Sequence, residues 1–87
     1  MTQEIEIWLK ELLRKNNKSV YESLINENID ILNTNFFENG LVDSFGVMSV
    51  IEEIEKKYSI TLNEKHFEQR RFSTISGLKD IISEEIS

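Results

Sequence analysis

The sequence predicts an all-α domain, a small four-helix bundle made of three main helices and a short third helix. Apolar residues recur at intervals of three and four along most of the chain, which is the spacing of one helix face. Proline is absent and there are only three glycines, so few residues interrupt a helix. Alternating β-branched runs bounded by turns, which a sheet requires, are not found. With 87 residues, the chain is expected to form a single domain over residues 1–87.

The first helix is predicted to begin near Thr2, which can cap it, with Glu4 in the first turn opposing the helix dipole. Asn16 and Asn17 weaken this helix, because asparagine prefers caps and turns. Trp8 lies on the apolar stripe, so we interpret it as a core residue and not as a recognition residue. The stripe consists of Ile5, Trp8, Leu9, Leu12 and Leu13.

The conformation of residues 18–35 is the least readable from the sequence. Apolar residues within 20–25 have helical spacing, which favours a short helix or an extension of the first helix. The asparagines that follow predict a loop, and their density invites comparison with a calcium-binding loop. That interpretation fails, because a motif starting at Asn26 would have Ile31 where it needs glycine and Phe37 where it needs glutamate. No metal site is predicted.

A loop-to-helix junction at residues 39–46 organises the chain. Gly40 tolerates the positive φ of a turn, while Asp43 and Ser44 carry oxygens that can cap a helix running from about Ser44 to Lys57. Ser44 is either a capping residue without chemistry or an attachment point, since a helix N-terminus favours a phosphodiester. The predicted inward face of this helix is Val47, Ile51, Ile54 and Tyr58, with Val50 adding width.

A second row on the same helix consists of Phe45, Met48 and Glu52. If this row is exposed, Phe45 and Met48 form a partner-docking patch beside Ser44; otherwise they widen the core stripe. Glu52 and the neighbouring glutamates lack a nearby histidine and any sign of a pocket. We therefore expect a solvated acidic face that can steer basic partners, and not a catalytic pair.

The last third of the chain is predicted to hold the short helix and the final one. An extended segment at 59–62 precedes the short helix at about Lys65 to Gln69, with Phe67 pointing inward and His66 on the surface. Phe72 is expected to close the core, and Ser73 or Thr74 to cap the final helix. The apolar stripe of that helix is Ile75, Leu78, Ile81, Ile82 and Ile86.

Composition excludes several classes of protein. Sixteen acidic and ten basic residues give a net charge of −6, which argues against nucleic-acid binding. The absence of cysteine excludes disulfides and thiolate zinc sites. Neither a signal peptide nor an apolar run of membrane-spanning length is found, so a cytoplasmic protein without membrane insertion is expected. The sequence has a single histidine and no pair of acidic residues that point to a common site, so the side chains that catalysis needs are not found. We therefore do not predict an enzyme.

The segment Phe-Phe-Glu-Asn-Gly-Leu-Val-Asp-Ser-Phe-Gly at 36–46, followed by Ile-Glu-Glu-Ile-Glu at 51–55 and by Tyr58, resembles the acyl carrier protein family. The resemblance implies an acyl-carrier-like bundle in which Ser44 carries 4'-phosphopantetheine and Asp43 helps to present it. It also implies that Phe45 and Met48 contact partner enzymes. The segment is most similar to the D-alanyl carrier proteins, although the region before it is several residues longer than in those carriers.

The resemblance also implies a set of partners. A phosphopantetheinyl transferase would load Ser44 from coenzyme A, and the arm would hold an amino acid or acyl group as a thioester. An ATP-dependent ligase would supply D-alanine, and a membrane-bound acyltransferase would use it for teichoic acid D-alanylation in cell wall biogenesis. A monomer suits a carrier that visits several enzymes. The alternatives are an acyl carrier for fatty-acid, polyketide or nonribosomal peptide synthesis, and a cofactor-free helical adaptor that binds a partner helix through Phe45 and Met48.

Overall fold

The structure is a computed structural model that describes residues 2–87, and these residues form only helices, turns and loops. The elements are α1 (Thr2–Asn16), α2 (Lys18–Asn26), α3 (Gly46–Tyr58), α4 (Glu64–Phe67), the 3-10 turn η1 (Arg70–Ser73) and α5 (Ile75–Ile86). The all-α prediction is confirmed: α1, α3 and α5 are the three main helices and α4 is the short one. Among the described residues, no helix is long and apolar enough to cross a membrane.

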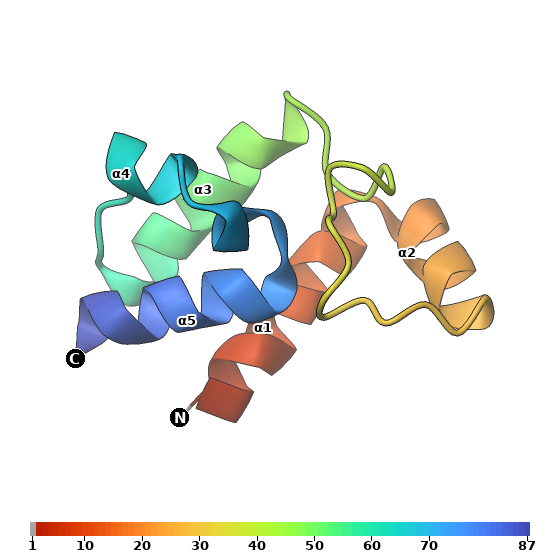
Figure 1. The fold of residues 1–87 in the computed structure, drawn as a ribbon, viewed down its shortest axis with the longest axis horizontal. Coiled ribbons are helices and arrows are strands. Elements are labelled where there is room, and N and C mark those ends of the chain that lie inside the picture. The colour runs from red at the N-terminus through yellow and green to blue at the C-terminus, as the bar shows by residue number, and fades with distance from the viewer. Residues whose placement is uncertain (1) are drawn as a thin grey trace.

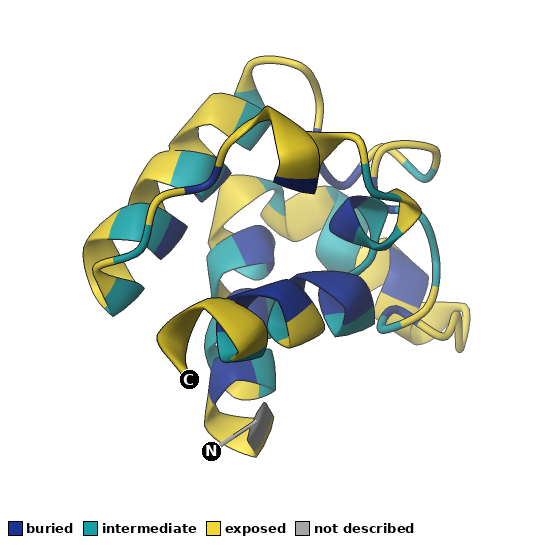
Figure 2. Cartoon of the chain, turned by 60° about the vertical axis from the view of Figure 1, so that its left-hand side comes forward, coloured by how far each residue is buried: buried dark blue, intermediate teal, exposed yellow. Residues whose placement is uncertain are grey.

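Helix α1 is the centre of the bundle, because it packs against α5, α3 and α2 (Figure 1). Figure 2 shows that the helices turn their buried faces toward one another and their exposed faces outward. The core takes Ile5, Leu9 and Leu13 from α1, and Val50 and Ile54 from α3. Helix α5 contributes Ile75, Leu78, Ile81 and Ile82, α2 contributes Leu24 and η1 contributes Phe72. The connecting segments contribute Ile31, Phe36, Leu41, Val42 and Leu62.

Helix α2 resolves the open question about residues 18–35, because it is a separate helix and not an extension of α1. Asn17 lies between the two helices, and its side-chain oxygen accepts a hydrogen bond from the Val20 N–H at 3.3 Å. Asparagine at this place ends one helix and caps the next. The connection from α2 to α3 is a long loop, which buries Ile31 and Phe36.

Several predictions about helix bounds and faces need correction. Helix α3 begins at Gly46, not at Ser44, and its most buried residues are Val50 and Ile54, while Val47 and Tyr58 are only partly buried. The face of α3 is therefore rotated toward Val50 relative to the predicted stripe. At the end of α5, Ile86 is 40% exposed and lies outside the core.

The side chains of α4 also point differently from the prediction. His66 is buried and Phe67 is 42% exposed, with its ring edge-to-face on Phe72 at a centroid distance of 5.1 Å. The His66 ring is held from two sides: Nδ1 accepts a hydrogen bond from the Asn63 N–H at 3.0 Å, and Nε2 lies 3.3 Å from Glu85 Oε2. His66 thereby completes a capping box at the start of α4.

Candidate functional site

Ser44 lies exposed at the point where a buried loop becomes α3. The two residues that precede Asp43, Leu41 and Val42, are almost completely buried, so the chain emerges from the core just before the serine. Within residues 2–87, the Ser44 hydroxyl makes no hydrogen bond. The side chain is thus accessible and its oxygen is not engaged in holding the fold.

Asp43, and not Ser44, caps α3. Its Oδ1 accepts hydrogen bonds from the N–H groups of Phe45 at 3.1 Å and Gly46 at 2.6 Å. The Asp43 carbonyl accepts the N–H of Val47 at 2.9 Å, which begins the helical hydrogen bonding. A carboxylate at this end also opposes the helix dipole. The interpretation of Ser44 as the helix cap is therefore wrong, because Asp43 occupies the amides that a capping serine would need.

The loop before Ser44 is fixed to the rest of the domain by backbone hydrogen bonds. The Val42 N–H donates to the Phe36 carbonyl at 2.9 Å, and the Phe36 N–H donates to the Ser73 carbonyl at 2.9 Å, which joins the loop to η1. Gly40 turns the chain with a φ of 83°, a conformation that side chains disfavour. Ser44 is therefore presented by a loop with a defined position.

The end of α1 supplies a second anchor, which sequence reasoning missed. Asn16 Nδ2 donates to the Leu41 carbonyl at 3.1 Å, and Asn17 Nδ2 lies 3.4 Å from the Gly40 carbonyl, which accepts its hydrogen bond. A Cβ atom on Gly46 would lie 2.9 Å from Asn16 Oδ1, so only glycine lets the amide sit there. Two consecutive asparagines at a helix end were the available signal, but their partners lie more than twenty residues away.

The row beside Ser44, made of Phe45, Met48 and Glu52, is exposed. This exposure was the condition for interpreting Phe45 and Met48 as a partner-docking patch. Phe45 is 87% exposed, Met48 is 59% exposed, and Glu52 is also exposed. These side chains therefore do not widen the core stripe. Together with Ser44 they form a surface in which two large apolar groups, normally buried, lie at the start of an acidic helix.

The acidic side chains of α3 do not assemble into a catalytic group. Glu55 Oε2 accepts a hydrogen bond from the Leu62 N–H at 2.8 Å and so fixes the segment that leaves the helix, while Glu52 and Glu53 face solvent. Among the described residues, no three His, Asp or Glu side chains gather into a metal-binding group. The site offers the exposed Ser44 hydroxyl and an apolar surface at the start of a helix whose first amides are bonded to Asp43.

A covalently attached phosphodiester fits this site. The first-turn N–H groups of Phe45, Gly46 and Val47 are already bonded to Asp43, so an attached phosphate would not be drawn into the helix end. It would extend into solvent from the exposed Ser44. That geometry suits a group that must reach the active sites of other proteins.

These features are those of a carrier protein, and the family comparison identifies the class. Residues 18–82 match the family described as the phosphopantetheine attachment site, which is most of the chain, so the chain belongs to this family. Proteins of this family carry 4'-phosphopantetheine covalently on a serine, and 4'-phosphopantetheine is the cofactor of this chain.

A particular relative is the D-alanyl carrier protein of Bacillus velezensis. It is 32% identical to this chain over 63 residues, which cover 72% of this chain and 77% of the relative. No solved structure gives a significant match. The predicted resemblance to the acyl carrier family, close to the D-alanyl carriers, is confirmed.

Proposed function

We propose that Ser44 is the attachment residue, and that the chain is a single carrier domain which other proteins load and unload. The observation that carries this proposal is the exposed Ser44 hydroxyl, left without a hydrogen bond because Asp43 performs the capping. A transferase can approach such a hydroxyl without unfolding any part of the loop. Asp43 acts as a supporting residue, because it fixes the first turn of α3 on which Ser44 depends.

The chemistry divides between the chain and its cofactor. On loading from coenzyme A, the Ser44 hydroxyl gives up its proton and its oxygen bonds to the phosphorus on the pantetheine side of the diphosphate. The P–O bond to the other phosphate breaks, so adenosine 3',5'-bisphosphate leaves and Ser44 is left as a phosphodiester. When bound, 4'-phosphopantetheine supplies a terminal thiol that holds an amino acid or acyl cargo as a thioester. The chain itself provides position and recognition, and its partners catalyse the transfers. We therefore propose a cytoplasmic carrier that acts as a monomer and not as an enzyme.

Phe45, Met48 and Glu52 form the proposed docking surface for these partners. Phe45 and Met48 expose apolar area that a partner can bury, and methionine adapts its shape to different surfaces. Glu52 lies on the same face and favours partners with basic side chains. The same surface would serve the phosphopantetheinyl transferase, the ligase and the acyltransferase, since each must reach Ser44.

Intact mass measured after incubation with coenzyme A and a promiscuous phosphopantetheinyl transferase tests the attachment residue. The wild type should gain one phosphopantetheine and Ser44→Ala should gain none. Ser49→Ala is the matched control, because Ser49 is also an exposed serine of the same region and should leave loading intact. Loading of Ser44→Ala would contradict the assignment. No loading of the wild type, with the transferase active on another carrier, would favour a cofactor-free adaptor.

We further propose D-alanine as the cargo, on the strength of the D-alanyl carrier relative. An ATP-dependent ligase would charge the carrier, and a membrane-bound acyltransferase would take the D-alanyl group for teichoic acid esterification. Charging the phosphopantetheinylated chain with purified D-alanine ligase, D-alanine, other amino acids and fatty acids tests the cargo. Selective charging with D-alanine supports the proposal, whereas charging only with a fatty acyl group would assign the chain to acyl transfer.

A further inference from the structure

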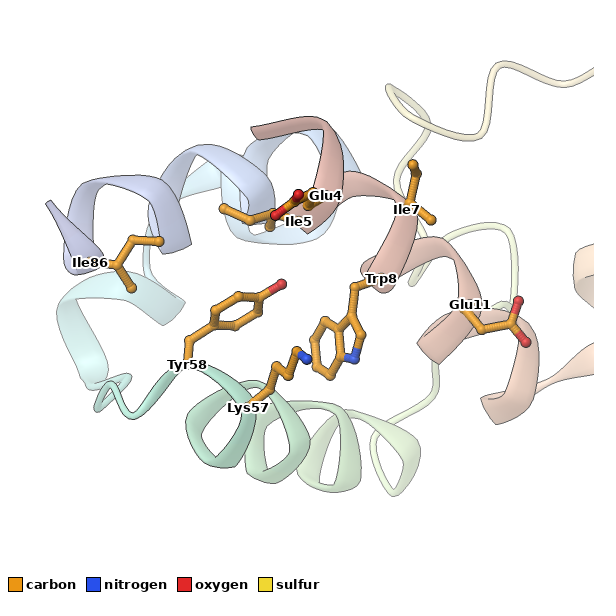
Figure 3. A pocket seen from close by; sticks show the side chains of 8 residues that line it. All are labelled: Glu4, Ile5, Ile7, Trp8, Glu11, Lys57, Tyr58 and Ile86. Carbon is orange, nitrogen blue, oxygen red and sulfur yellow. The ribbon is translucent and has the colours of Figure 1, made fainter. Parts of the chain in front are cut away.

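An apolar groove lies at the end of the bundle remote from Ser44. It has a volume of about 620 Å³ and opens between the start of α1 and the ends of α3 and α5 (Figure 3). Tyr58 and Lys57 line it from the last turn of α3, whereas Ser44 precedes the first turn. At about 1.5 Å per residue, the length of α3 separates the two sites by roughly 20 Å. The lining residues are Glu4, Ile5, Ile7, Trp8, Glu11, Lys57, Tyr58 and Ile86.

The groove has an aromatic floor and exposed aliphatic edges. Trp8 and Tyr58 point toward one another across it and pack edge-to-face, with ring centroids 5.3 Å apart at 86° (Figure 3). Trp8 is only partly buried and lines the groove, so its interpretation as a core residue alone needs correction. Ile7 is 65% exposed and Ile86 is 40% exposed, so both leave large apolar surfaces in water. Burying such aliphatic side chains against a partner releases free energy, and the aromatic floor offers a rigid contact surface.

Charge distinguishes between possible occupants. Glu4, Ile7 and Glu11 are spaced at i, i+3 and i+7 on α1, which places an exposed isoleucine between two carboxylates on one helix face. Within residues 2–87, Glu4 forms no ion pair, whereas Glu11 forms an exposed pair with Arg14 at 3.3 Å that a partner's cation would have to replace or share. Burial and the Glu4 charge together raise the pKa of Tyr58, so the carboxylate acts on the groove itself. Lys57 is the one basic residue of the lining.

We infer that this groove docks a basic amphipathic helix of a partner protein. An apolar side chain of that helix would cover Ile7 and the aromatic floor, and lysine or arginine one turn to either side would lie against Glu4 and Glu11. This is the helix-in-groove mode of recognition, and the net charge of −6 favours the same partner. A carrier held at this end keeps the Ser44 end free, a consequence that rests on the proposed attachment site.

The probe for this inference is an amidated peptide of about 16 residues, made of leucine and lysine with leucines at helical spacing. Binding is followed by the fluorescence of Trp8, the single tryptophan, and by amide chemical shifts of the full chain. Wild type should bind, with shifts confined to the groove residues. Ile7→Ser should weaken binding by about tenfold, since one isoleucine loses its burial. Glu4→Gln should weaken it about two- to fivefold, and less at high salt.

Controls separate this inference from the proposed function. Ile7 and Glu4 are exposed, so their variants should remain folded and should accept phosphopantetheine as the wild type does. Ser44→Ala and Phe45→Ser should bind the peptide unchanged. Equal binding of a leucine–glutamate peptide, or shifts centred on Phe45, would overturn the inference. Self-association through the groove, or binding of decanoate there in place of the peptide, would assign the groove to another occupant. Either result would also overturn the inference.

Discussion

Replacing Gly46 by alanine tests the contact between α1 and the loop that presents Ser44. In an ordinary helix this change stabilises by about 0.5–1 kcal/mol, because alanine loses less backbone entropy than glycine. Here the new Cβ would lie 2.9 Å from Asn16 Oδ1 and 3.0 Å from Asn16 Nδ2. The amide must move, and we expect this shift to break its hydrogen bond to the carbonyl of the buried Leu41.

The two effects have opposite signs, and the hydrogen bond dominates. A part-buried carbonyl left without its partner costs about 1–3 kcal/mol. Gly46→Ala should therefore destabilise the wild type by about 1 kcal/mol net, which lowers the midpoint of thermal unfolding by about 4–8 °C in a domain of this size. Asn16→Ala alone should cost about 1–2 kcal/mol, because it removes the same bond.

The decisive experiment is the double-mutant cycle. With Asn16→Ala in place, the nearest atom to the Cβ of Ala at position 46 is Asp43 Oδ1 at 3.2 Å, a contact that a small shift relieves. Gly46→Ala should then stabilise by about 0.5–1 kcal/mol, so the coupling between the two sites is about 2 kcal/mol. Urea unfolding of the four proteins measures these values. Stabilisation by Gly46→Ala in the wild-type background, with effects that simply add, would refute the reasoning.

Two further predictions concern the cap of α3 and the ion pair of α5. Asp43→Ala should lower the free energy of unfolding by about 1–2 kcal/mol and Asp43→Asn by less, because asparagine keeps an acceptor oxygen; equal losses in urea unfolding would contradict the capping role. Hydrogen bonds from the Arg71 guanidinium, one of them 2.7 Å long, lower the pKa of Glu84 below its usual 4.5. The Glu84 carboxylate therefore binds a proton more weakly in the folded chain than in the unfolded chain. The stabilisation by the Arg71–Glu84 pair is complete above the usual pKa of Glu84 and is lost as the pH falls through the lowered pKa. Arg71→Gln should reduce the fall in the free energy of unfolding as the pH is lowered. If that fall is the same in the variant and the wild type, the pair does not contribute to stability.

The sequence by itself determined the features that depend on neighbouring residues. Helical spacing predicted α1, α3 and α5, because a periodic apolar face must be buried wherever the helix packs. Thr74 was one of two predicted caps for α5, and its Oγ1 accepts the Gly77 N–H at 2.9 Å. The position of Ser44 at a loop-to-helix junction was also readable, since Gly40 and Asp43 act within a few residues of it.

Tertiary structure decided which residue performs each task. Whether Asp43 or Ser44 caps α3 depends on the path by which the loop reaches the helix, and contacts with distant segments, among them Asn16 of α1, fix that path. His66 is buried, and its Nε2 lies 3.3 Å from Glu85 Oε2 of α5. Such contacts join segments that are distant along the chain, so no local spacing encodes them; they arise only when the helices pack. The proposed carrier function rests on both levels: the motif predicts the serine, and the packing leaves its hydroxyl exposed.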